Sequence, residues 1–244
     1  DCLARGVGDY TVTGSAASSS DTSGLTVTPG AIDHFTIATV GPQVAGTAFN
    51  IVITAYDFWG NVKTDYNGTP TLSGLAASPG CAACSPVVGS ATASYGTPSF
   101  TLGIATVSVT AKAASGAAQI TVADGTKTGA SNTFNVTNSL DYGGVTVDSI
   151  ATPRTAGSGF TVTVHAFDEF GNVLIGATDG SLSGLAGSLG CAGCSSFVAV
   201  TPATYTAISW TAGVGTSTVT AVRSTASATA QITAIVGGKS NTSN

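Results

Sequence analysis

The sequence predicts an all-β protein built from two tandem antiparallel β-sandwich domains, and three observations lead to that prediction. The chain of 244 residues carries one pattern twice: residues 46–61 read GTAFNIVITAYDFWGN, and residues 157–172 read GSGFTVTVHAFDEFGN. Apolar and polar side chains alternate in both segments, which is typical of half-buried strands. Short apolar runs are separated by Gly, Asn, Ser and Pro, without a sustained helical period. Units of about 110 residues with this pattern favour sandwiches with Greek-key connections.

The duplication extends along most of each unit. Three further segments match: residues 72–76 with 182–186, 81–84 with 191–194, and 119–121 with 231–233. Such a period marks a repeated domain, and each copy is long enough to bury its own core. We therefore predict domains at residues 31–138 and 139–244, preceded by a strand and linker segment at residues 1–30.

Period-two alternation then predicts the strands and the residues that point inward. We expect the following side chains in the two cores: Phe49, Ile51, Ile53 and Ala55 in the first copy, and Phe160, Val162, Val164 and Ala166 in the second. Further strands are expected at residues 105–111, 117–122 and 133–137, and at 218–222 and 228–234 in the second copy.

The two ends of the sequence suggest how copies join. The first repeat closes with SNTFNV at residues 131–136, whereas the second reaches only Ser243 and Asn244, so we expect the second sandwich to lack its last strand. Residues 9–13 and 25–28, with a Ser/Ala-rich linker between them, resemble the closing hairpin of a repeat. This pattern predicts that Leu25, Thr26 and Val27 are a donor strand for the open sheet of another copy. An excerpt of one long covalent array fits the same pattern.

A pattern at residues 45–62 and 156–173 resembles a known family. It reads Ala-Gly-x-x-Phe-x-Ile/Val-x-Ile/Val-x-Ala-Tyr/Phe-Asp-x-x-Gly-Asn-Val, and it is similar to the bacterial immunoglobulin-like repeats of invasin-type and other large surface proteins. The resemblance covers both repeats nearly end to end. It implies immunoglobulin-like sandwiches with a structural or adhesive role and no catalytic residues. The Cys-x-x-Cys segments are not part of the family pattern.

The cysteines indicate an oxidising compartment. Each repeat carries one pair, Cys81 with Cys84 and Cys191 with Cys194, which we expect to form local disulfides. Loop-closure entropy gives about 2 kcal/mol for so short a ring. Haem attachment is excluded because it would need a His directly after the second Cys of a pair, and neither pair has one. Redox and zinc sites are the alternatives to disulfides. Cys2 is left over, either as an intermolecular thiol or as a passive one.

Composition excludes several classes of function. Charged residues make up 8% of the chain, and seven basic against twelve acidic residues give a net charge of −5. No basic patch is available to neutralise a phosphate backbone, so we expect no nucleic-acid partner. No apolar run is long enough for a membrane span, and the first residues do not form a signal peptide, which suggests a processed product or an excerpt.

Candidate sites for chemistry are few. Neither His34 nor His165 is matched in the other copy, and we expect no enzyme, cofactor or metal. We interpret the repeated Asp-x-x-Gly-Asn segments as capped turns, with calcium binding through Asp57 and Asp65, or Asp168 and Asp179, as the alternative. Three aromatic residues lie beside these turns: Phe58, Trp59 and Phe170. They either plug the end of a sandwich or form an exposed patch that binds carbohydrate or protein. Three acceptor motifs for N-linked sugar are present, at Asn67, Asn135 and Asn241.

These observations favour a non-catalytic subunit of an extracellular filament or cell-surface fibre. Its partners would be copies of itself, joined head to tail by exchanged strands, an arrangement that does not close on itself. The alternative is a segment of a large adhesin or of a glycan-binding stalk, with Trp59 or Tyr66 contacting sugar. A third, weaker hypothesis is an electron-carrying or metal-binding fibre that uses the Cys-x-x-Cys loops.

Overall fold

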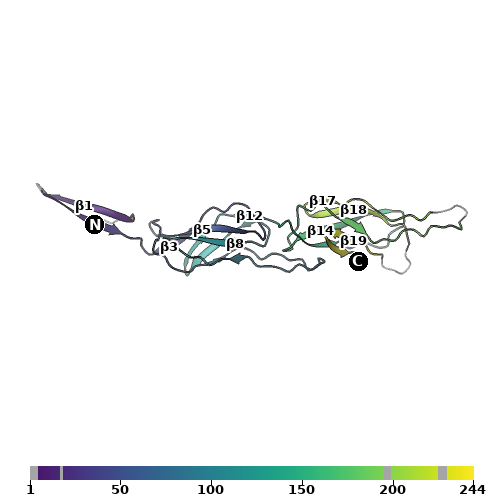
Figure 1. The fold of residues 1–244 in the computed structure, drawn as a ribbon, viewed down its shortest axis with the longest axis horizontal. Helices are drawn as coiled ribbons and strands as arrows, with labels where there is room; N and C mark the ends of the chain where they lie inside the picture. Colours follow the sequence, from purple (N-terminus) through teal and green to yellow (C-terminus); the bar gives the residue numbers. More distant parts are fainter. Residues whose placement is uncertain (1–4, 17–18, 195–198, 225–229) are drawn as a thin grey trace.

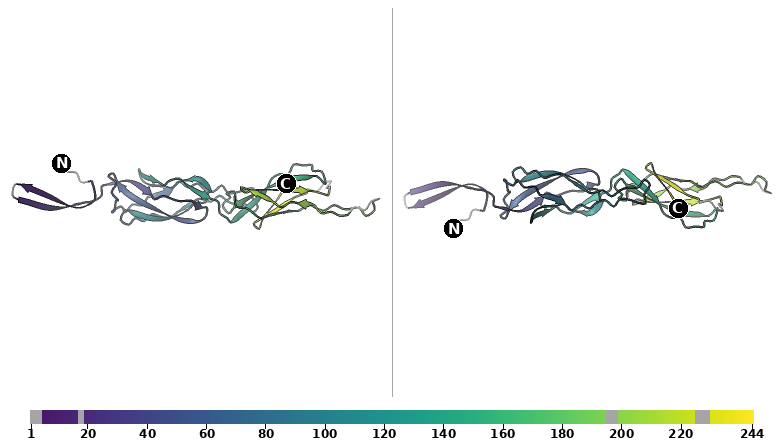
Figure 2. Two further views of the ribbon diagram at one scale, coloured as in Figure 1. Left: turned by 90° about the horizontal axis from the view of Figure 1, so that it is seen from above. Right: turned by 90° about the horizontal axis from the view of Figure 1, so that it is seen from below.

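The computed structural model describes residues 5–16, 19–194, 199–224 and 230–244, and the regular structure of these residues is entirely β. Three parts follow one another along the longest axis of the molecule: an N-terminal hairpin, a first sandwich (unit 1) and a second sandwich (unit 2) (Figure 1). The two further views show the same elongated arrangement (Figure 2). Within the described ranges, no helix is long and apolar enough to cross a membrane.

The N-terminal hairpin pairs β1 (Gly8–Ala16) with β2 (Ser19–Val27) in antiparallel register, with Gly8 opposite Val27 and Tyr10 opposite Leu25. The Ser/Ala-rich linker expected inside this segment is wrong for most of its length, because the two strands continue through residues 14–16 and 19–24. Paired backbone groups satisfy their hydrogen bonds whatever the side chains are. Tyr10 and Leu25 share one face with Val12, and all three are exposed.

Unit 1 is a sandwich of two layers. One layer has the strand order β3-β5-β8-β7, and the other combines the order β11-β10-β6 with the order β4-β12-β9. The strands are β3 (Ile32–Ile37), β4 (Gln43–Val44), β5 (Ala48–Asp57), β6 (Thr71–Ser73), β7 (Ser94–Tyr95), β8 (Ile104–Thr110), β9 (Ser115–Ala118), β10 (Thr121–Asp124), β11 (Lys127–Ala130) and β12 (Phe134–Thr137). All pairings are antiparallel except β4 with β12, which is parallel.

Unit 2 repeats most of this arrangement. Its sheets have the order β13-β14-β18-β16, with β17 also paired to β18, and the order β15-β19-β20. The strands are β13 (Tyr142–Val147), β14 (Gly159–Asp168), β15 (Ser181–Ser183), β16 (Thr204–Tyr205), β17 (Ser209–Thr211), β18 (Val214–Thr220), β19 (Thr233–Val236) and β20 (Lys239–Thr242). Within the described part of unit 2, the β4-β12-β9 layer has no counterpart.

Each unit has its own hydrophobic core, as the alternation of apolar residues predicts. Ile51, Ile53 and Ala55 are buried in unit 1, and unit 2 buries their counterparts, which are Val162, Val164 and Ala166. Phe49 and Phe160 are only half-buried beside these cores. The exact division of the chain at residues 138 and 139 stays a prediction.

The expected strand positions are confirmed closely in unit 1 and less closely in unit 2. The strand expected at residues 117–122 is divided between β9 and β10, because β9 pairs with β12 in one sheet and β10 pairs with β11 and β6 in another. The strand expected at residues 218–222 is displaced toward the N-terminus, since β18 begins at Val214 and ends at Thr220. The strand expected at residues 228–234 falls partly outside the described residues, and β19 begins only at Thr233.

Candidate interface between the β-sandwich units

The repeated Asp-x-x-Gly-Asn segments, here called latch turns (residues 57–61 and 168–172), are each organised by one buried carboxylate. Oδ1 of Asp168 accepts hydrogen bonds from the backbone N–H of Phe170 at 2.9 Å and of Asn172 at 2.8 Å. Its Oδ2 accepts from the Asn172 side chain and from the backbone N–H of Ser139, both at 2.9 Å. Asp168 has no exposed surface. The capped-turn hypothesis is thereby confirmed.

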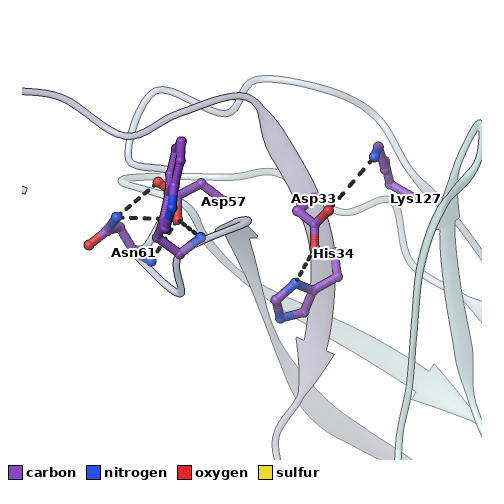
Figure 3. Close-up of polar contacts among 6 residues, drawn as sticks. Asp33, His34, Asp57, Asn61 and Lys127 are labelled. Carbon is purple, nitrogen blue, oxygen red and sulfur yellow. Dashed lines mark hydrogen bonds and ion pairs between the residues drawn. The ribbon is translucent and has the colours of Figure 1, made fainter. Parts of the chain in front are cut away.

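Asp57 is held in the same way in unit 1. It accepts from the backbone N–H of Trp59 and Asn61, from the Asn61 side chain, and from the backbone N–H of Gly30, each at 2.9 Å. Figure 3 shows the Asp57–Asn61 contacts beside a separate group in which Asp33 lies between His34 and Lys127. Burial acts to raise the pKa of Asp57, but these hydrogen bonds outweigh it and lower the pKa from 3.8 to about 2.

The carboxylates that would be the calcium ligands make other contacts instead. Asp65 forms an ion pair with Lys63 at 2.7 Å, and Asp179 accepts a hydrogen bond from the Tyr142 hydroxyl. The oxygens of Asp57 and Asp168 face N–H donors, and a cation cannot occupy those positions. Among the residues that the structure describes, no group of three or more His, Cys, Asp or Glu is arranged to hold a metal ion.

The latch turn of unit 2 packs against the adjoining surface of unit 1. The Phe170 ring lies against Gly46 and 4.4 Å below the Lys112 ammonium group, a cation–π geometry. Phe170 also contacts the unit 1 core, and its carbonyl accepts from Gly80 N–H at 3.1 Å. Because Gly46 has a φ of 86° and a Cβ there would lie 2.7 Å from the ring, a larger residue would meet both strain and a clash.

Asn172 connects the two units through its side-chain amide. Its Oδ1 accepts from the Ala114 backbone N–H at 2.8 Å, and its Nδ2 donates to the Lys112 carbonyl at 2.9 Å. The residue is 4% exposed, so these bonds are shielded from water. We call Gly46, Gly80, Lys112 and Ala114 the receiving surface of unit 1.

The first disulfide loop completes this interface. Cys81 and Cys84 form a disulfide, as expected, and Cys84 is only 4% exposed because it packs against Gly144 of unit 2. The next residue, Ser85, donates its backbone N–H to the Val145 carbonyl at 3.2 Å, which forms an isolated bridge between the units. The second expected pair, Cys191 with Cys194, also forms a disulfide, but Cys194 is exposed.

The latch turn of unit 1 has a smaller partner, the segment that leads into the hairpin. Asn61 Nδ2 donates to the Arg5 carbonyl at 2.7 Å, as Asn172 Nδ2 donates to the Lys112 carbonyl. The aromatic residues of this turn remain largely uncovered, since Phe58 is 75% exposed and Trp59 is 54% exposed. The plug hypothesis is therefore wrong for these two residues, because no sandwich end closes over them.

Register shows which part of unit 1 the hairpin reproduces. Leu25 and Val27 precede Gly30 by the same number of residues as Phe134 and Val136 precede Ser139, and Gly30 and Ser139 donate to equivalent aspartates. Val27 lies opposite Gly8, and Val136 lies opposite Ser115, so that Arg5 and Lys112 each lie three residues before the start of the paired strand. The N-terminal hairpin thus corresponds to the paired strands β9 and β12, the second of which leads from unit 1 into unit 2.

The remaining expected sites have mixed surroundings. Asn67 and Asn135 are exposed, whereas Asn241 Nδ2 donates to the carbonyls of Val145 at 2.9 Å and Ala83 at 3.2 Å, bonds that a sugar on that nitrogen would disrupt. Cys2 lies outside the described residues. Tyr66 is 8% exposed and its hydroxyl donates to Asp124, so its ring is not available to stack on a sugar.

The interface itself is what the sequence reasoning missed. Lys112 and Ala114 carry no motif, and Gly46 belongs to the repeated pattern, but their roles at the interface follow only from the position of unit 2. A usable signal was present in the latch turns, which keep an aromatic residue before glycine in both copies, Trp59 and Phe170. A repeated exposed aromatic residue is a common mark of an interface.

Solved structures with similarity to this chain include bacterial surface proteins. The adhesin FdeC of Escherichia coli matches 97% of this chain and 73% of its own at 16% identity, with a TM-score of 0.44. Invasin, described as a bacterial integrin-binding protein, matches 98% and 45% at 15% identity, with a TM-score of 0.42. Domains 4–9 of the surface-layer protein SbsC match 97% and 34% at 18% identity, with a TM-score of 0.32.

This chain spans less than half the length of the invasin and surface-layer structures. Similarities of this size do not assign a function. In sequence, no protein family and no curated protein matches the chain.

Proposed function

We propose that the chain is a non-catalytic structural segment of an extracellular filament or cell-surface fibre, in which immunoglobulin-like units stack end to end. The observation that carries this proposal is the interface between units 1 and 2, where the Asp168 turn is bonded to both units and Asn172 is buried between them. Such a joint fixes the angle between units, a property that a spacer or fibre needs. Two local disulfides suit an oxidising, extracellular location.

The rigidity of the joint can be tested by small-angle scattering of the full chain. We expect a distance distribution with one maximum extension, that of a stiff rod. The double substitution Phe170→Ala and Asn172→Ala should broaden the distribution and shorten the mean extension. The matched pair Trp59→Ala and Asn61→Ala changes the other latch turn and should leave the angle between the units unaltered. A wild-type distribution as broad as that of the Phe170 and Asn172 variant would contradict the proposal.

For the joining of chains we propose strand exchange, with Leu25, Thr26 and Val27 of one copy added to unit 2 of the next. Leu25 is 45% exposed, and Leu25 and Val27 hold the positions that Phe134 and Val136 hold in unit 1. Burying each would contribute about 1.5–3 kcal/mol.

Exchange requires β2 to separate from β1, and the register indicates how that loss is offset. Phe134 and Val136 of β12 pair with Ala118 and Ser115 of β9, as Leu25 and Val27 pair with Tyr10 and Gly8. The hydrogen bonds that β2 loses with β1 would therefore be replaced by hydrogen bonds with the segment of unit 2 that corresponds to β9. The segment of unit 2 that corresponds to β9 lies partly outside the described residues.

Strand exchange makes a clear prediction for electron microscopy. The purified chain should form head-to-tail fibres, and deletion of residues 1–27 should abolish them. Fibres that persist after the deletion would refute the exchange. A matched control is the double substitution Thr11→Ala and Thr13→Ala, which alters the polar face of β1 and leaves β2 intact.

The second candidate is a segment of an adhesin or a glycan-binding stalk, favoured by the exposed rings of Phe58 and Trp59. Aromatic faces of this kind stack on sugars. A glycan array probed with the wild-type chain and with Trp59→Ala tests this function. Binding that depends on Trp59 would support it. Absence of binding would contradict it, and the structural role would then be the one function proposed.

A further inference from the structure

Unit 2 has its own version of the receiving surface, and no latch turn packs on it. Gly157 corresponds to Gly46: it has a φ of 82° against 86°, and its N–H donates to the Ala221 carbonyl at 2.8 Å, as Gly46 donates to Ala111. A Cβ added to Gly46 would meet the Phe170 ring, whereas a Cβ added to Gly157 would have no atom within 4 Å. Gly157 therefore has the positive φ of Gly46 although no aromatic ring packs against it.

Two further residues belong to that surface. Gly190, with a φ of 65°, corresponds to Gly80, with a φ of 64°, directly before the first cysteine of each disulfide. Because Ala221 corresponds to Ala111, Val222 holds the position of Lys112, and the next residue, Arg223, places an exposed cation beside it. We call Gly157, Gly190 and Arg223 the receiving surface of unit 2.

The partner this surface fits is present elsewhere in the same chain. The latch turn of unit 1 has the bonding pattern of the turn in unit 2, with Trp59 in the place of Phe170 and Asn61 in the place of Asn172. Among the hydrogen bonds of the described residues, neither the Trp59 carbonyl nor Asn61 Oδ1 accepts one, whereas both equivalents in unit 2 do. Tryptophan is also the aromatic residue that binds a cation most strongly.

We infer that the latch turn of unit 1 docks on the receiving surface of unit 2 in a second copy of this chain. In that contact the Trp59 ring lies on Gly157 beneath the Arg223 guanidinium, and the Trp59 carbonyl accepts from Gly190 N–H. The Val222 carbonyl, which corresponds to the Lys112 carbonyl, accepts the Asn61 amide hydrogen bond that the Arg5 carbonyl accepts within one chain. This inference rests on the head-to-tail order of the proposed function, and it adds a contact distinct from strand exchange.

The contact and the exchanged strand are compatible because of the register already described. If Leu25 and Val27 take the place of Phe134 and Val136, then Gly30 takes the place of Ser139, and the Asp57 turn arrives where the Asp168 turn lies in the internal interface. The second copy must displace Arg5 from Asn61. Docking therefore competes with an internal hydrogen bond, which lowers the affinity of the contact between copies.

Photo-crosslinking can detect the contact directly. A benzophenone amino acid replaces Trp59 in the full chain, and an equimolar mixture of unlabelled and 15N-labelled chains distinguishes links between copies from links within one. Mass spectrometry should find mixed-isotope links from position 59 to peptides that contain Gly157 or Arg223. Links only to the segment around Arg5 of the same chain, or no links between copies, would overturn the inference.

A second probe separates this inference from strand exchange. The same amino acid at Leu25 reports whether β2 inserts into unit 2 of another copy. Links between copies from position 25 with none from position 59 leave strand exchange standing and overturn the docking. Links from position 59 to the receiving surface support the docking whether or not position 25 reacts.

Sedimentation velocity over a concentration series provides the energetic test. Trp59→Ala and Arg223→Glu should each weaken self-association about tenfold, the loss expected for about 1.4 kcal/mol. Arg223→Lys should retain it, because the substitution keeps a cation above the ring. Val52→Ala, at an exposed site in the middle of β5, is the control and should have no effect. Equal association by Arg223→Glu and wild type would contradict the inference.

Discussion

Substitution of Asn172 by Ala should uncouple the two units, and the structure gives the size of the effect. The side chain makes three hydrogen bonds of 2.8–2.9 Å, two of them to unit 1 and one to Asp168, and it is 4% exposed. Each of these hydrogen bonds contributes about 1 kcal/mol. We expect the free energy of unfolding of unit 2 to fall by about 2–3 kcal/mol.

The chain offers a reporter for each unit, because its two tryptophans lie in different ones. In a Trp59→Phe background, the fluorescence of Trp210 follows the unfolding of unit 2 in urea. In a Trp210→Phe background, Trp59 follows unit 1. Each unfolding midpoint and slope then gives the free energy for one unit.

Asn61→Ala is the matched control for Asn172→Ala. The Asn61 side chain also bonds to its own turn aspartate, and its one other partner among the described residues is the Arg5 carbonyl in the segment before the hairpin. We expect a loss of about 1 kcal/mol in unit 1. If Asn172→Ala lowers the stability of unit 2 by no more than Asn61→Ala lowers that of unit 1, the contacts between units contribute nothing measurable and the reasoning fails.

Three further predictions address the core, the latch turn and the disulfides. Ile53→Ala in the closed core should reduce the free energy of unfolding by about 2–5 kcal/mol in urea, whereas Val52→Ala on the exposed face of the same strand should change it by under about 0.5 kcal/mol. Because the folded pKa of Asp57 is lowered to about 2, its contribution is present above about pH 4 and is lost as the pH falls toward 2; Asp57→Asn should flatten that decline in acid titrations, and an unchanged slope would contradict it. Replacing both cysteines of the Cys81–Cys84 pair by Ser should weaken the interface and lower unit 2 stability in the Trp210 assay, whereas the same change at Cys191–Cys194 should not alter the interface.

The strands of the central sheets could be predicted because their alternation is set by local burial. Ile51, Ile53 and Ala55 point inward, as do their counterparts in unit 2, and period two in the sequence is sufficient to show it. The hairpin was harder to predict, since residues 14–16 and 19–24 carry Ser, Ala and Gly typical of a linker. Their strand structure comes from backbone pairing with each other, which composition does not reveal.

The interface was beyond sequence reasoning for a different physical reason. Asn172 and Lys112 meet only when two complete sandwiches are placed end to end, so their contact depends on geometry accumulated over both folds. The latch aspartates were assigned correctly to turns, but each also bonds to a backbone N–H that lies 27–29 residues earlier in the chain. That long-range acceptor role leaves no local pattern.

The short connection between the sandwiches also governs how the molecule responds to pulling. Asn138 and Ser139 are buried, and Ser139 is bonded to Asp168, so no slack segment separates the units. A load applied along the long axis therefore reaches the Asp168 turn before either sheet can lengthen. We expect the few hydrogen bonds of this joint to break under a smaller force than the β-sheets on either side.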